Sequence, residues 1–180
     1  MAGVPEIEFS FPVPVDTVGK APKKMRIVAD AAARRALARR FDLIAIDSFI
    51  AEVTIGRIAD SVLIRLSGSF SADIVQACVV SREPVRTRIE ETVFERLGPQ
   101  GRLETESVFD IDDEDPPVPF SDDSIELGEL LAQHLAVSID PYPRAPDAAA
   151  GSVSVNEDPV AGRQGNRPFE SLAMLGKKPT

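Results

Sequence analysis

The residues whose types could support chemistry are few and widely spaced in this sequence. Its single cysteine, Cys78, has no neighbouring lysine or histidine that would lower the thiol pKa, so we interpret it as a small core residue. Its single histidine, His134, has no second histidine or cysteine within helical reach, and a mostly carboxylate zinc shell is unusual. With one cysteine and one histidine, Cys/His catalysis is possible only if His134 lies next to Cys78 in the folded chain. We therefore predict no catalytic residue, no metal site and no cofactor.

Carboxylates offer two further candidates. The acidic run at 110–115 contains groups that calcium and magnesium prefer, but it lacks the glycine and distal glutamate of an EF-hand loop. We interpret it as a solvated loop, or alternatively as a flexible strap for a basic protein. The glutamates of 82–97 alternate with arginines, which favours cross-strand charge pairs over acid-base chemistry. No glycine spacing typical of a phosphate-binding loop occurs.

Arginines are concentrated in the segment 30–41, DAAARRALARRF, which has high helix propensity and a plausible N-cap at Asp30. On a helix, Ala33, Leu37 and Phe41 form the buried side, while Arg35 and Arg39 point nearly opposite. The preceding Lys20 could extend the positive surface. The pattern predicts an anion-binding surface for nucleic acid, with a merely solvated helix face as the alternative; its residues are Lys23, Lys24, Arg34, Arg35, Arg39 and Arg40.

The net charge of −9 is unevenly distributed, with +1 in residues 1–97 and −10 in residues 98–180. We therefore expect any nucleic-acid contact in the first half, and a role in solubility or in binding a basic protein for the second half. The start of the chain has neither a basic nor an apolar leader region, and no window approaches the length of a membrane span. We expect a cytoplasmic protein that makes no membrane contact.

The elements that must position these residues follow from periodicity. We predict an edge strand at residues 6–15 and a short strand at residues 25–29. From 43 to 97 the pattern has period two, punctuated by Gly56, Asp60, Gly68 and Ser69, which predicts an antiparallel meander. Residues 86–97 fit either a strand or a helix, and we favour a strand. In the run 61–70 we expect Val62, Ile64 and Leu66 to share the buried face.

The second half of the chain predicts one more helix. Residues 98–123 form an acidic loop, after which Asp123 and Glu126 resemble a capping box. The helix that follows is ended by Pro141 and Pro143, and its apolar stripe is Leu127, Leu130, Leu131 and Leu135. Residues 146–166 lack periodicity and predict a disordered tether.

The expected fold class is therefore α+β. We predict a single domain at 1–145, built on an antiparallel sheet of about five or six strands with two packed helices. A flexible C-terminal tail follows, in which residues 167–180 form a short docking segment through Phe169, Leu172 and Leu175.

Four stretches carry a resemblance to a known family. They are the Ala/Arg helix followed by FDLIAI, the segment GSFSADIVQACVVSREPV, the helix that runs into DPYPRAP, and the terminal NRPFESLAMLGKK. Together they resemble the YceD family of large ribosomal RNA subunit accumulation proteins, in particular its alphaproteobacterial branch. The positions that match the family motifs are Cys78, Glu83, Pro84, Pro168 and Phe169.

The resemblance implies a non-catalytic role in large ribosomal subunit biogenesis and in accumulation of its RNA. The implied partners are the precursor of the large subunit, ribosomal RNA or a ribosomal protein, with no small-molecule substrate. An adaptor that regulates a metabolic or lipid-synthesis enzyme is the alternative, and a hydrolase using aspartate or glutamate is a weaker one. Many family members have a second cysteine three residues after the first; Ser81 stands there, so no metal site is carried over.

Overall fold

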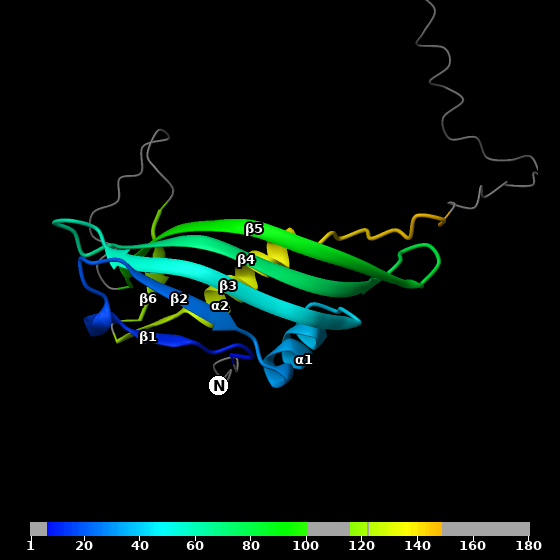
Figure 1. Ribbon diagram of the computed structural model, residues 1–180, viewed down its shortest axis with the longest axis horizontal. Coiled ribbons are helices and arrows are strands. Elements are labelled where there is room, and N and C mark those ends of the chain that lie inside the picture. Colours follow the sequence, from blue (N-terminus) through cyan, green and yellow to red (C-terminus); the bar gives the residue numbers. More distant parts are fainter. Residues whose placement is uncertain (1–6, 101–115, 122, 149–180) are drawn as a thin grey trace, which may run out of the picture. The chain divides into compact units, whose positions relative to one another are not determined.

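The computed structural model describes residues 7–100, 116–121 and 123–148 (Figure 1). The first half contains β1 (Pro12–Pro14), a single 3-10 turn (Val15–Thr17), β2 (Lys23–Val28), α1 (Ala31–Arg40) and β3 (Ala45–Arg57). The remaining elements are β4 (Ile64–Ala77), β5 (Pro84–Pro99), β6 (Val118–Phe120), β7 (Ser124–Glu126) and α2 (Leu127–Ser138). The acidic run at 110–115, most of the tether and the whole docking segment lie outside the described residues.

The main sheet has five strands in the order β2-β3-β4-β5-β6. Strands β2 to β5 pair antiparallel with their sequence neighbours, which confirms the predicted meander and the α+β class. Residues 86–97 belong to β5 and are therefore a strand, as favoured. The fifth strand departs from the expected pattern because β6 pairs parallel with the end of β5, with Leu97 opposite Val118.

Strand β4 is longer than the sequence suggested, because Gly68 and Ser69 lie within it and do not end it. At Gly68 the neighbouring strand comes so close that a β-carbon would collide with the Glu52 carbonyl oxygen and would lie 2.7 Å from the Val53 α-carbon. The glycine therefore allows close backbone approach and does not mark a turn.

Alternation along the strands gives the sheet an inner, buried face and an outer face. Ile64 and Leu66 are fully buried while Arg65 between them is exposed. Val62, expected on the buried face, lies before β4 and is 41% exposed. Both helices lie against the inner face: α1 contacts β3, and α2 contacts β5 and β1. Figure 1 shows α2 passing behind β3, β4 and β5.

Helix α1 matches the predicted segment. The Asp30 carboxylate accepts a hydrogen bond of 2.8 Å from the Ala33 N–H, and so caps the helix. The helix ends at Arg40 with Phe41 as its C-cap, after which Asp42 adopts a φ of 54°, in the left-handed region. Leu37 is fully buried, and Ala33 and Phe41 pack against the core at its margin.

Helix α2 buries the predicted leucine stripe, but the predicted capping box is wrong. The helix begins at Leu127, so Asp123 and Glu126 precede it, and Glu126 makes no side-chain cap. The Glu126 carboxylate instead accepts hydrogen bonds from the Ser10 hydroxyl at 3.1 Å and the Phe11 N–H at 3.2 Å. Pairing of β7 with β1 in a separate two-stranded sheet causes this difference.

That pairing also corrects the expectation for residues 6–15. Among the described residues 7–15, only Pro12–Pro14 form a strand, and this strand pairs with β7 in the small sheet and not with the main sheet. At the start of α2 a β-carbon on Gly128 would collide with the Phe9 carbonyl, so the small sheet and the helix need this glycine to approach each other.

Candidate functional site

The structure places Arg35 and Arg39 one turn apart on the exposed side of α1. Within the described ranges, neither side chain has an ion-pair or hydrogen-bond partner. Arg39 also lines a groove of about 810 Å³ between α1 and residues 7–11, together with Ala32, Ala36 and Val28. On α1, these two arginines form the part of the predicted anion surface that remains available to a ligand.

The two flanking arginines are already engaged. Arg40 donates two hydrogen bonds of 2.8 Å to the Glu129 carboxylate and one of 3.0 Å to Glu8. The hydrogen bonds from Arg40 hold the pKa of Glu129 below its ordinary value and raise the pKa of Arg40. Arg34 donates to the Ala29 carbonyl at 2.7 Å. Both guanidinium groups therefore stabilise the fold.

The lysines lie at the other end of the sheet. Lys23 and Lys24 are exposed at the start of β2, whereas α1 follows the far end of that strand. A strand of this length spans about 16 Å. The predicted surface is therefore divided into an arginine pair on α1 and a lysine pair that lies elsewhere.

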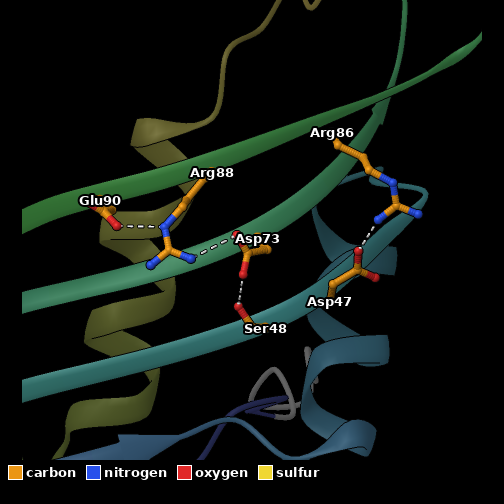
Figure 2. A network of polar contacts seen from close by, with 6 residues as sticks. All are labelled: Asp47, Ser48, Asp73, Arg86, Arg88 and Glu90. Atoms are coloured by element: carbon orange, nitrogen blue, oxygen red, sulfur yellow. Dashed lines mark hydrogen bonds and ion pairs between the residues drawn. The ribbon is translucent and has the colours of Figure 1, made fainter.

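Charge pairs on the outer face involve Arg86, Arg88 and Glu90 of β5 (Figure 2). Arg86 contacts Asp47 at 2.6 Å, and Arg88 contacts Asp73 of β4 at 3.3 Å as well as Glu90 of its own strand at 2.6 Å. Arg88 and Asp73 are direct register partners, as the prediction of cross-strand pairs requires. Exposed pairs of this kind contribute about 0–1 kcal/mol each.

Cys78 lies in the turn between β4 and β5 and is fully buried, as predicted. Its N–H donates to the Glu83 carbonyl at 2.8 Å, and its carbonyl accepts from the Arg82 N–H at 3.0 Å. Hydrogen bonding by the Ser81 side chain, and then by the N–H groups of Ser81 and Ala145, lowers the pKa of the Cys78 thiol to about 6, although burial acts in the opposite direction. The thiol pKa is therefore lowered without an adjacent cation, because hydrogen bonds from the Ser81 side chain and from backbone N–H groups stabilise the thiolate.

The same turn holds the segment that follows α2. The Ala145 N–H donates to the Cys78 sulfur at 3.3 Å, and the Val79 N–H donates to the Pro143 carbonyl at 2.9 Å. The Gln76 side-chain amide donates to the Asp140 carbonyl at 2.8 Å. Two of the stretches that carry the family resemblance, QACVVSREPV and DPYPRAP, are therefore in direct contact.

The other motif positions are distributed differently. Glu83 is exposed and closes the turn, and Pro84 begins β5. Ser81 is exposed, and its hydroxyl donates to Glu83 at 3.3 Å. Pro168 and Phe169 lie outside the described residues. In the described part of the chain, no group of three or more His, Cys, Asp or Glu side chains is arranged to hold a metal ion.

His134 reaches the sheet and not the cysteine. Its Nε2 atom lies 3.1 Å from a carboxylate oxygen of Glu95 on β5, and both side chains are about one-quarter exposed. This contact ties α2 to the sheet, in agreement with the structural role predicted for the histidine.

These observations define an α+β protein with two exposed arginines on α1 that lack a described partner and with charge pairs on the outer face of the sheet. Comparison with protein families matches residues 66–175 to the family described as large ribosomal RNA subunit accumulation protein YceD. The chain belongs to the YceD family. The match covers β4 from Leu66 onward, β5 and α2 together with the Cys78 turn, while α1 precedes it. No curated protein and no solved structure matches the chain.

Sequence reasoning missed two features of these surfaces. Glu8 and Glu129 neutralise Arg40 from positions remote in sequence, and no local pattern indicated this. Phe94 is 65% exposed on the outer face although it is a large apolar residue. The alternation of β5 could have identified Phe94 as exposed, because Val93 and Leu97 point to the buried face and Phe94 therefore points to the opposite one.

Proposed function

We propose that this chain is a non-catalytic factor that assists biogenesis of the large ribosomal subunit and accumulation of its RNA in the cytoplasm. Membership of the YceD family carries the proposal, because that family is described by this role. Within the described ranges, no helix combines the length and apolar character needed to cross a membrane.

Contact with the precursor of the large subunit is the proposed mode of action, through ribosomal RNA or a ribosomal protein. Two features support it. The Arg35 and Arg39 side chains on α1 are exposed and lack a described partner, so they can meet phosphate without breaking an existing ion pair. The acidic second half supplies charge of the sign that suits a basic ribosomal protein.

Loss of the protein from cells that encode it tests the proposal. The ratio of large-subunit to small-subunit RNA should fall, and the full chain supplied in trans should restore it. In gradient centrifugation, tagged protein should travel with immature large subunits. An unchanged RNA ratio, with the protein confined to soluble fractions, would instead support an adaptor that regulates a metabolic or lipid-synthesis enzyme.

A further inference from the structure

We infer that the outer face of the main sheet binds single-stranded RNA, with Phe94 stacking on a base and Lys24, Arg26 and Arg65 contacting the backbone phosphates. The inference rests on the proposed function and assigns it a surface. Register, exposure, surface shape and charge each support it.

Register aligns the participating residues in rows. Lys24 of β2 is opposite Thr54 of β3, Thr54 is opposite Ser67 of β4, and Ser67 is opposite Phe94 of β5. Since neighbouring strands are about 4.8 Å apart, this row extends roughly 14 Å across the sheet. The next row along the strands contains Arg26, Glu52, Ser69 and Thr92.

Phe94 differs from the phenylalanines of the core. Phe49 is 1% exposed and packs against the rings of Phe9 and Phe70, with centroids 5.5 and 5.7 Å away. Phe94 is 65% exposed, and its row neighbour is a serine. A large aromatic surface left in water on a strand has an unfavourable hydration free energy that a stacked partner would remove.

Short side chains leave space over the strands next to Phe94, although Phe94 itself lines neither of the hollows there. Two adjoining hollows of about 580 and 440 Å³ lie over the outer face. Arg26, Glu52 and Ser69 line both of them. The larger hollow is also lined by Thr92, Arg88, Glu90 and Glu91, and the smaller one by Lys24 and Thr54. A platform of small hydroxyl side chains next to an aromatic ring admits flat bases and offers hydrogen bonds to them.

The cations of this region remain available to a ligand. Lys24, Arg26 and Arg65 are exposed, and no residue in the described part of the chain pairs with them. The carboxylates nearer to α1 are engaged differently, because Asp73 and Glu90 are held by Arg88. Two carboxylates reduce the local positive charge: Glu52, which is opposite Arg26, and the exposed Glu91, which lines the larger hollow.

This combination favours nucleic acid over a peptide. Single-stranded nucleic acids are commonly bound by aromatic rings that stack on bases and by cations that follow the backbone. A peptide groove would be expected to present several apolar pockets, whereas Phe94 stands among hydroxyl and charged groups. A duplex would present its bases in a stack that Phe94 cannot enter.

Binding of the full chain to a mixed-sequence RNA of about 12 nucleotides tests the inference, with fluorescence anisotropy as readout and a blunt duplex as comparison. Tighter binding of the single strand is expected. Phe94→Leu should weaken it by roughly 5- to 100-fold and Phe94→Trp should preserve it, because leucine is apolar but cannot stack. The double variant Arg26→Gln/Arg65→Gln should lower the log-log salt slope by about 1.4.

Tyr142→Leu provides the matched control, since Tyr142 is 71% exposed but follows α2 and should not affect RNA binding. Absent binding, equal affinity for the duplex, or wild-type binding by Phe94→Leu would overturn the inference. A second outcome separates the two proposals. If Phe94→Leu restores the ratio of large-subunit to small-subunit RNA in depleted cells, the outer-face inference fails while the proposed function stands.

Discussion

The guanidinium of Arg40 and the carboxylate of Glu129 form two parallel hydrogen bonds of 2.8 Å, which join α1 to α2. A third bond, from Arg40 to Glu8 at 3.0 Å, brings the segment before β1 into the same cluster. The two-pronged geometry is the strong form of such a pair. This arginine therefore fixes the relative positions of three segments that are far apart in sequence.

Arg40→Gln should lower the free energy of unfolding by about 1–2 kcal/mol near neutral pH, because it leaves two carboxylates without their cation. Since Arg40 holds the pKa of Glu129 below its ordinary value of 4.5, this stabilisation is present above that pH and is lost as the pH falls below it. Urea denaturation of both proteins between pH 7 and pH 3 should show the difference shrinking with acidification. Arg35→Gln, on the same helix without a described partner, should change stability by less than about 0.5 kcal/mol. An equal effect of the two substitutions would contradict the assigned role of Arg40.

Cys78→Ala should remove a pH-dependent contribution to stability. The hydrogen bonds that lower the folded-state pKa to about 6, from an ordinary value of 9, favour the thiolate in the native state. Their contribution is therefore fully present above pH 9 and is lost as the pH falls through 6. Denaturation at several values across this range should show wild type gaining stability over Cys78→Ala as pH rises. A constant difference would show that the thiol stays protonated.

Gly68→Ala should destabilise the protein by about 2–3 kcal/mol, because a β-carbon would collide with backbone atoms of Glu52 and Val53, which cannot move like a side-chain end. The expected loss in the thermal midpoint is several degrees. Gly19→Ala is the control, since a β-carbon there meets no atom closer than 4.0 Å. Equal midpoints for the two variants would mean that β3 and β4 can separate at this point without cost.

Elements with a strong repeating pattern could be predicted from sequence. The α1 helix follows from its alanines, arginines and Asp30 cap, and the leucine stripe of α2 marks its buried side. The meander follows from period-two alternation. In each case the signal is local, because residues a few positions apart share one face.

Features that depend on long-range pairing could not be predicted. Ser124–Glu126 form a strand because residues 12–14 lie beside them, and this displaces the start of α2 beyond the apparent capping box. Glycine is typical of turns, but Gly68 lies within β4, where the backbone of β3 comes too close to leave room for a β-carbon. The division of the predicted anion surface into an arginine pair and a lysine pair could not be predicted for the same reason. It depends on the ion pair between Arg40 and Glu129 and on the length of β2, which separates the lysines from α1.

The arginine pair on α1 gives the last prediction. Arg35→Gln/Arg39→Gln should weaken association with immature large subunits, because both guanidinium groups face solvent without a described partner and can contact phosphate.

Loss of two phosphate contacts should flatten the log-log salt dependence of that association by about 1.4 to 1.8 units. Glutamine has a helix propensity close to that of arginine, and Asp30 still caps the helix, so the double variant should fold and keep its thermal midpoint. Co-sedimentation at several salt concentrations gives the slope, with Arg86→Gln as a control for the loss of a paired arginine on the outer face. Because Arg86 already pairs with Asp47, its loss should leave the slope nearly unchanged. If the folded α1 variant retains wild-type association and slope, α1 is a solvated face, and the contact with the particle lies on the outer face or in the acidic second half.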